Sequence, residues 1–176
     1  MKLLTHYIQE KFIIKKNKRA DYKYFPQTKK KLKTLIEQRI KDEGNLVNLN
    51  NIDVSNITNM SRLFEGFRDF NGDISNWDVS NVKDMSFMFN KCREFNQDIS
   101  NWNVYNVTNM NSMFLNSTNL KTIYVSNLWN VDNVTDSVNM FGNCKSLVGA
   151  TSYDSTKKDK TMANYTTGYL TYKANN

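Results

Sequence analysis

The sequence predicts an α/β solenoid of about four repeats, and three observations indicate this fold class. Residues 70–94 and 95–119 are near-copies of each other, with 13 identities in 25 aligned positions. The same apolar skeleton occurs 25 residues before the first of them and, in degenerate form, 27 residues after the second. A fixed period of this length is typical of solenoids, in which each repeat buries its apolar side only against its neighbours.

Within one repeat the spacing predicts a coil of short strand, turn, short helix and turn. Trp77 and Val79 alternate as strand residues do. Asparagines such as Asn81 and Asn106 recur at one repeat position, and we expect them to bond backbone groups at the corners. The next apolar residues stand at i, i+3, i+4 and i+7, which predicts one face of a short helix. These residues are Met85, Met88, Phe89 and Cys92.

A stack of such coils needs a cap at each end, because the terminal coils would otherwise expose apolar surface and unpaired strand edges. We expect a basic N-terminal α/β capping module over residues 1–47 and the repeats over residues 48–150. A loop and a closing strand follow over residues 151–176. The three parts are expected to form one cooperative domain.

The N-terminal module is expected to contain a helix after two short strands, at residues 10–16 and 22–25. Thr28 is suited to cap the start of this helix and Gly44 to end it. At the other end of the chain, residues 168–173 alternate as a closing edge strand does. The apolar face predicted for the helix consists of Leu32, Leu35, Ile36 and Ile40.

The repeated line FNxDISxWDVSNVxxMxxMF resembles the unit of BspA-like leucine-rich-repeat proteins of low-GC bacteria and their phages. LKTIYVSN from Leu120 and LVGATSYDSTKKD from Leu147 resemble the closing coil of that family. YFPQTKKKLKTLI from Tyr24 resembles an entry segment of its shorter members. The resemblance covers about residues 22–174. It implies leucine-rich-repeat-like, right-handed coils and an adhesion or interaction role, with no known catalytic residues.

Composition places the chain among folded proteins without a membrane span. An aromatic content of 12% is too high for a disordered chain. No run approaches the roughly 18 apolar residues of a membrane helix, and the first residues lack the apolar core of a secretory signal. The sequence therefore predicts a cytoplasmic protein, whereas many relatives in the resembled family lie on the cell surface.

The net charge of +7 is unevenly distributed. Residues 1–44 carry 13 Lys and Arg against 5 Asp and Glu, and the rest of the chain carries 11 against 12. Two interpretations stay open: a positive surface that binds a partner, or the composition of a lysine-rich and asparagine-rich genome.

Conventional catalytic and metal-binding patterns are absent from the sequence. His6 is the only histidine, so no histidine-based metal cluster or nucleophile–base pair can be assembled. Cys92 and Cys144 share a repeat position two coils apart, which at roughly 4.8 Å per coil is too far for a disulfide. Asp73 and Asp98 stand one repeat apart, but the next copy has no carboxylate there, which favours corner residues over an acid–base pair. We expect a non-enzymatic protein with no metal, cofactor or small-molecule substrate.

Function is therefore expected in exposed residues that the repeat does not need. Lysines in the first turns of the predicted helix oppose its dipole, so helix stability does not explain them. The leading hypothesis is a protein-interaction module whose partner has an acidic or phosphate-mimicking surface. Two alternatives remain: nucleic-acid binding, or a phage or mobile-element inhibitor of a host nucleic-acid-handling defence complex. The candidate partner-binding residues are Lys15, Lys16, Lys18, Arg19, Lys29, Lys30, Lys31, Lys33, Asp73, Asp98 and Tyr124.

Overall fold

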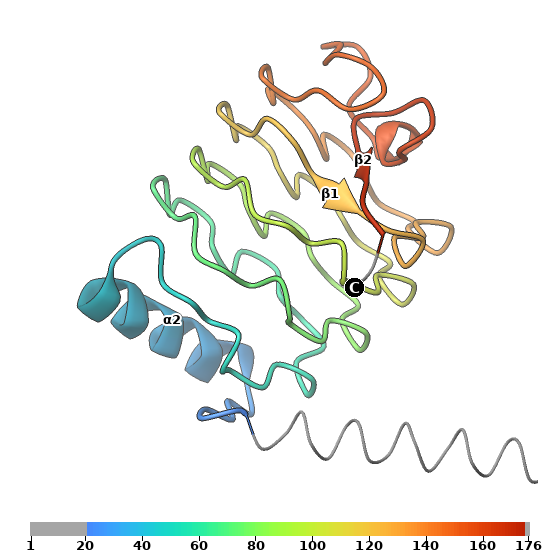
Figure 1. Cartoon of the computed structure of the whole chain (residues 1–176). Helices are drawn as coiled ribbons and strands as arrows, with labels where there is room; N and C mark the ends of the chain where they lie inside the picture. The colour runs from blue at the N-terminus through green and yellow to red at the C-terminus, as the bar shows by residue number, and fades with distance from the viewer. Residues whose placement is uncertain (1–20, 175–176) are drawn as a thin grey trace, which may run out of the picture.

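The computed structural model describes residues 21–174. After the helix α2 (Lys29–Glu43), the chain winds through successive coils that stack along one axis (Figure 1). The other regular elements of the described residues are β1 (Tyr124–Val125), the 3-10 helix η1 (Lys160–Met162) and β2 (Thr171–Tyr172). Most of the fold is therefore held by hydrogen bonds between coils rather than within helices or long strands.

Helix α2 has the two ends that the sequence indicates. The Thr28 hydroxyl accepts a hydrogen bond from the N–H of Lys31 and so satisfies one of the free donors of the first turn. Gly44 follows the helix with a φ of 85°, a left-handed value that glycine adopts without strain, and its N–H donates to the carbonyl of Ile40. The bounds of the helix are therefore set by the capping side chain of Thr28 and by the backbone freedom of Gly44.

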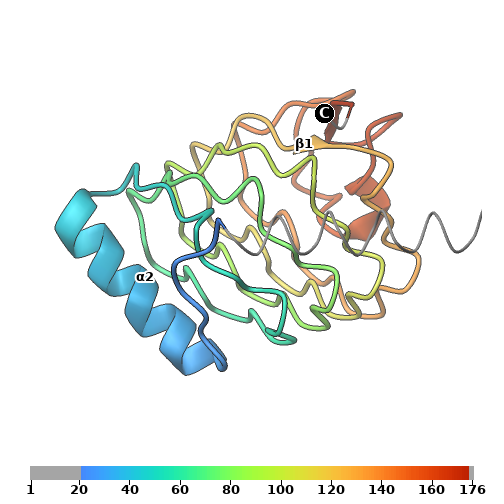
Figure 2. The same ribbon diagram turned by 60° about the horizontal axis from the view of Figure 1, so that its bottom comes forward.

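The helix covers the open end of the first coil (Figures 1 and 2). Leu32 and Ile36 are fully buried, and Leu35 and Ile40 lie half-buried at the margin of the same core. Arg39 is also buried. The apolar face predicted from the sequence thus includes one charged residue, whose contacts are described below.

Successive coils are joined by parallel hydrogen bonds one repeat apart. The backbone N–H groups of alternate residues donate to carbonyls of the next coil, at 2.8–3.0 Å for the first pair of coils. The same pattern joins the second coil to the third and the third to the fourth. Parallel bridges link Asn59, Asp84, Asn109 and Asp136 in that order. In the first pair of coils the donors are Met60, Arg62, Phe64 and Gly66, and the acceptors are Asp84, Ser86, Met88 and Asn90.

The short helix predicted over residues 85–92 is wrong, and tight turns replace it. Phe87 and Lys91 have left-handed φ values of 56° and 64°, which interrupt any α-helix. The N–H of Phe89 donates to Met113 of the next coil instead of to a carbonyl one turn earlier. Successive three-residue turns place side chains inward at the same spacing as a short helix, so the apolar pattern alone does not separate the two.

Stacked phenylalanine rings form the centre of the core. Phe64, Phe89, Phe114 and Phe141 occupy equivalent positions, with ring centroids 5.4, 5.6 and 5.9 Å apart and planes within 7° of parallel. Tyr169 closes the stack edge-on to Phe141 at 5.5 Å. One apolar cluster therefore runs from α2 to the C-terminal segment.

Buried indole groups bond the preceding coil in two of the repeats. Trp77 Nε1 donates to the Leu49 carbonyl at 3.0 Å, and Trp102 Nε1 donates to the Ile74 carbonyl at 3.1 Å. The fourth copy has two extra residues, and its Trp129 Nε1 has no partner among the described residues. The last repeat therefore lacks this bond.

Asparagine side chains satisfy backbone groups at another corner, as expected from their spacing. Asn81 Nδ2 donates to the Ser55 carbonyl and Asn106 Nδ2 to the Ser80 carbonyl, both at 2.8 Å. Polar atoms that a corner would leave unpaired are thus bonded within the stack.

The C-terminal segment folds back onto the last coils. β2 pairs in parallel with β1, with Tyr124 opposite Thr171. Apart from this pair, the strands predicted in the described repeats are reduced to isolated bridges such as that between Asn48 and Asp73. The closing strand lies where the alternation of residues 168–173 indicates.

Candidate functional site

The four candidate lysines of α2 divide into two pairs. Lys29 Nζ donates to Asn59 Oδ1 at 3.0 Å and to the hydroxyl of Ser61 at 2.9 Å. Lys33 lies over the ring of Phe67, with Nζ 5.8 Å from its centroid. Both side chains are thus turned toward the first coil.

The other two, Lys30 and Lys31, are exposed and make no side-chain hydrogen bond or ion pair within residues 21–174. Only these two of the four lysines are free to contact a partner. Lys15, Lys16, Lys18, Arg19 and His6 lie outside the described residues.

Asp73 and Asp98 form corners of two successive coils. Each Oδ1 accepts a hydrogen bond from the backbone N–H two residues later, at 2.9 Å from Ser75 and 2.8 Å from Ser100. Partial burial raises the pKa of Asp73, but the hydrogen bonds from Ser75 outweigh it, so the pKa lies below its ordinary value. Both carboxylates therefore have a role in the fold, as short polar residues commonly have in turns.

The structure brings Asp98 and Tyr124 together through a residue that the sequence did not single out. Lys173 Nζ lies 2.5 Å from Asp98 Oδ2 and 5.8 Å from the centroid of the Tyr124 ring. The ammonium group beside the carboxylate is one cause of the lowered pKa of Asp98, although partial burial acts in the opposite direction. Because the two residues are 75 positions apart, spacing within the repeat could not have indicated Lys173.

An open hollow lies beside Tyr124 at the corner of the third and fourth coils. Asn119 Nδ2 donates to Glu94 Oε1 at 2.7 Å, which fixes the carboxylate at its edge. The hollow is open to solvent and combines polar and charged groups with one aromatic ring. The residues lining it are Glu94, Asn96, Asn119, Lys121, Thr122, Tyr124 and Ser146.

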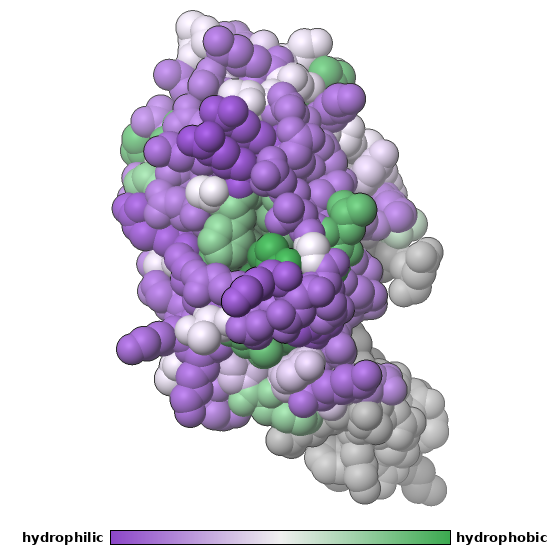
Figure 3. Space-filling model, turned by 90° about the vertical axis from the view of Figure 1, so that its left-hand side faces the viewer, coloured by the Kyte–Doolittle hydropathy of each residue, from purple (hydrophilic) through white to green (hydrophobic). Residues whose placement is uncertain are grey.

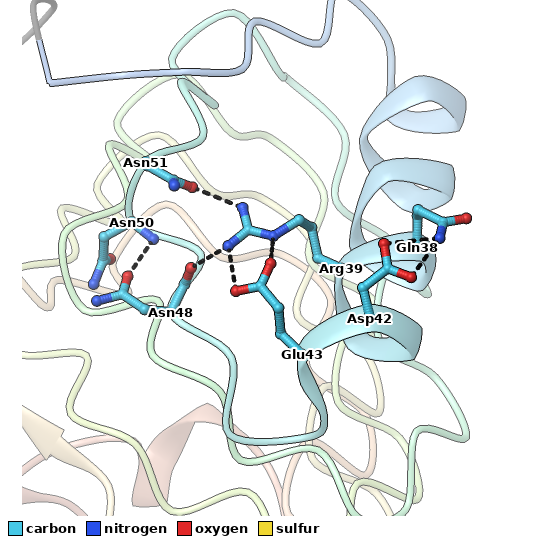
Figure 4. Close-up of polar contacts among 7 residues, drawn as sticks. All are labelled: Gln38, Arg39, Asp42, Glu43, Asn48, Asn50 and Asn51. Carbon is cyan, nitrogen blue, oxygen red and sulfur yellow. Dashed lines mark hydrogen bonds and ion pairs between the residues drawn. The ribbon is translucent and has the colours of Figure 1, made fainter.

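A second cluster centres on the buried Arg39 of α2 (Figure 4). Its guanidinium donates to both carboxylate oxygens of Glu43, to Asn51 Oδ1 at 3.0 Å and to the Asn48 carbonyl at 3.1 Å. It also lies over the ring of Tyr24, 5.3 Å from the centroid. The planar fork of arginine suits such a set of acceptors. The cluster fastens α2 to the first coil.

The cysteines are buried and unsuited to nucleophilic chemistry. Burial raises the pKa of Cys92 and of Cys144 to about 12, so both are thiols at neutral pH. Each Sγ donates to a phenylalanine carbonyl of a neighbouring coil at 2.9 Å, Cys92 to Phe64 and Cys144 to Phe114. Both are free, as predicted, and each serves the packing of its coil.

Two further properties concern the described residues as a whole. Within residues 21–174 no group of His, Cys, Asp or Glu side chains is arranged to hold a metal ion. None of the helices in the same range has the length and apolar character needed to cross a bilayer.

The chain matches the model of the family described as "Mycoplasma protein of unknown function, DUF285" over residues 30–154 and 124–172. These ranges include most of the chain, and the protein belongs to this family. No curated protein and no solved structure matches the sequence.

Proposed function

We propose that this DUF285 protein is a non-enzymatic protein-interaction module, built as a leucine-rich-repeat-like solenoid of the BspA type. The family match over the repeats supports the relationship. The regular hydrogen bonds between coils support a stiff scaffold, because each coil is bonded to its neighbours along several backbone positions. Such a scaffold presents a preformed surface and so avoids part of the ordering cost of binding.

The observation that carries the proposal is three exposed tyrosines, on β1, on β2 and in the segment between η1 and β2. Tyr124 and Tyr165 are each 37% exposed and Tyr172 is 52% exposed. The rings of Tyr165 and Tyr172 lie 5.0 Å apart, and Lys173, paired with Asp98, lies against Tyr124. We call Tyr124, Tyr165, Tyr172 and Lys173 the tyrosine surface.

Tyrosine is enriched at protein interfaces because it offers a large apolar ring and a polar tip. These exposed rings contribute nothing to the buried core. The fold does not need these residues to be tyrosines, whereas a surface that binds another protein does use such side chains. Nucleic acid remains the alternative partner, since Lys30 and Lys31 are free on α2 and tyrosine rings can stack on bases.

The test is affinity capture from a nuclease-treated lysate of the source organism, with wild-type protein compared to a Tyr124→Ala/Tyr172→Ala variant. Tyr105→Ala is the matched control, because Tyr105 is 56% exposed and lies on a different corner. We expect one or more proteins to be retained by the wild type and the control and lost from the double variant. Retention that occurs only in a parallel lysate without nuclease treatment, or equal retention by all three proteins, would refute the proposal.

A further inference from the structure

Five cations of the repeats lie at one corner of the stack. All five are exposed, and none of their side chains forms a hydrogen bond or ion pair with a residue in the range 21–174. In Figure 1 the successive coils lie above α2 and turn back on the left-hand side of the picture. Figure 3 shows this side of the molecule, which is largely hydrophilic with small apolar patches. We call Arg68, Lys91, Arg93, Lys121 and Lys145 the corner ridge.

Backbone contacts place these residues in register. The N–H of Glu94 donates to the Arg68 carbonyl at 3.0 Å, so the corners of the first two coils are stacked. The N–H of Lys91 donates to the third coil at 2.8 Å, and the N–H of Lys121 to Asn96 Oδ1 at 2.6 Å. Arg68 and Arg93 thus occupy equivalent positions one coil apart, and Lys145 occupies the same position two coils further on.

The fold does not explain this arrangement. Like charges stacked on neighbouring coils repel, as like charges do across neighbouring strands. Other lysines of the repeats contribute to the stack: Lys83 Nζ donates to Asn106 Oδ1 at 3.3 Å and Lys160 Nζ to the Val134 carbonyl at 2.5 Å. The ridge side chains have no such bonds, and their charges remain available to a partner.

We propose that the corner ridge docks an acidic α-helix of the protein partner, laid along the stacking axis. This inference rests on the proposed function, in which the partner is a protein, and it specifies which part of that protein is bound. Coils joined by parallel backbone hydrogen bonds lie about 4.8 Å apart, and the stacked rings of the core are 5.4–5.9 Å apart between centroids. An α-helix rises about 5.4 Å per turn, and carboxylates three or four residues apart lie about 5–6 Å from each other on its surface. One acidic residue per turn therefore meets one coil of the ridge.

The neighbouring residues favour a helix over a nucleic-acid backbone. Asp69 and Glu94 are exposed directly beside Arg68 and Arg93 and would repel a continuous row of phosphates. Val148, 52% exposed, bonds through its N–H to the carbonyl of Lys121 and offers an apolar contact. An amphipathic acidic helix accommodates this mixture, since basic and apolar residues flank its acidic stripe.

The experiment uses the full chain and two synthetic helical peptides of about 20 residues, read by fluorescence anisotropy. One peptide carries its glutamates as a single stripe at every third or fourth position. The other has the same composition with the glutamates spread around the helix. We expect the full-length protein to bind the striped peptide at least about tenfold more tightly, and the affinity to fall as salt rises because exposed charges are screened.

The ridge is tested with Arg68→Glu/Arg93→Glu/Lys145→Glu, and the neutral set Arg68→Gln/Arg93→Gln/Lys145→Gln serves if the reversed protein does not fold. The matched control, Lys23→Glu/Lys41→Glu/Lys157→Glu, makes the same change in net charge on exposed lysines away from the ridge. We expect the ridge variants to bind the striped peptide at least about tenfold more weakly than the wild type, and the control to bind it with the wild-type affinity.

Three results would overturn the inference: equal binding of the two peptides, undiminished binding by the ridge variants, or tighter binding of a single-stranded DNA oligonucleotide than of the striped peptide. The capture experiment separates this failure from that of the proposed function. Suppose that a native partner is lost from the tyrosine variant but is still bound by the ridge variant. That result would support the proposed interaction function and would refute docking of an acidic helix on the corner ridge.

Discussion

Asp98 and Lys173 lie 75 positions apart in the sequence and form an ion pair of 2.5 Å. Lys173 directly follows β2, which pairs with β1 of the fourth coil. The side chain thus reaches past Tyr124 to the carboxylate of the coil beneath. This contact ties the closing strand to two successive coils.

Asp98→Asn is expected to weaken this tie without breaking the corner. An asparagine can still accept the hydrogen bond from the N–H of Ser100, just as Asn103 accepts one from the N–H of Tyr105 at the next corner of the same coil. The pKa of Asp98 is lowered in the folded state, so its contribution is present above the ordinary carboxylate pKa and is lost as the pH falls through the folded value. We expect a lower urea midpoint for the variant at pH 7 and convergence with the wild type in acid.

The dependence of stability on salt concentration distinguishes the contribution of the ion pair from that of the turn. The exposed pair is screened at high ionic strength, so the difference in urea midpoint should shrink there. Asp73→Asn is the control, because Asp73 occupies the same corner without a lysine partner. An equal and salt-independent loss in both variants would assign the effect to the turn alone.

Phe114→Ala is expected to destabilise the protein by about 3–5 kcal/mol, the usual cost of removing a core phenylalanine. Phe114 is fully buried between Phe89 and Phe141, so the deletion opens a cavity within the stack. Equilibrium urea unfolding measures the change. Tyr105→Ala, on an exposed corner, should stay within about 0.5 kcal/mol. A loss below about 1 kcal/mol for Phe114→Ala would contradict the core assignment.

The sequence predicted the residues of the core better than the backbone that presents them. Met85, Phe89 and Cys92 are buried at the places that the repeat indicates. Their helical spacing also suits successive tight turns, and the left-handed φ values at Phe87 and Lys91 carry no strong sequence signal because neither residue is a glycine. The period of 25 residues indicated which residues of successive coils stack on each other, but not the hydrogen-bond pattern within a coil.

The candidate site was predicted less well, for two physical reasons. A run of lysines shows that a segment is positively charged, but not which way each side chain points. Lys29 donates to Ser61 of the first coil, whereas the side chain of Lys31 is exposed. Contacts such as Lys173 with Asp98 join parts of the chain outside the repeat, where no spacing rule applies. The sequence gives one weak indication of the corner ridge, because Arg68 and Arg93 stand one repeat of 25 residues apart.

The two thiols are expected to resist labelling in the folded protein. Burial raises the pKa of each to about 12, so almost no thiolate is present near pH 8.5. A thiol reagent should modify neither cysteine in native buffer and both in urea, as counted by mass spectrometry. Stability should fall as the pH rises above the ordinary cysteine pKa of about 8.5, because only the unfolded chain then ionises freely. Rapid native labelling of Cys92 would contradict its burial.

Lys29 and Lys31 are expected to differ although they lie on the same helix. Lys29→Ala removes hydrogen bonds to Asn59 and Ser61 and should lower the unfolding free energy by about 1 kcal/mol. Lys31→Ala removes a solvated side chain and should change it by less than about 0.5 kcal/mol. The measurement is the pair of urea unfolding curves. Equal effects would show that Lys29 does not fasten α2 to the first coil.

Arg39→Met is expected to loosen α2 by removing the guanidinium while keeping an apolar stem of similar length. The change leaves Asn51 Oδ1 and the Asn48 carbonyl without their donor, and Glu43 without its partner. A hydrogen bond to a charged group contributes about 1.5–3 kcal/mol, and we expect a loss of unfolding free energy in this range. Amide hydrogen exchange should locate the loss in α2.

Arg39→Lys tests whether charge or geometry is responsible. A lysine restores the positive charge but cannot reach Glu43, Asn51 and Asn48 together, because its ammonium is a single point at the end of a flexible stem. We expect Arg39→Lys to recover only part of the stability lost in Arg39→Met. In other proteins, replacing a buried charged group with a well-packed apolar side chain has raised stability. A gain in stability for Arg39→Met would show that packing of the arginine stem against the first coil, and not its hydrogen bonds, holds α2 in place.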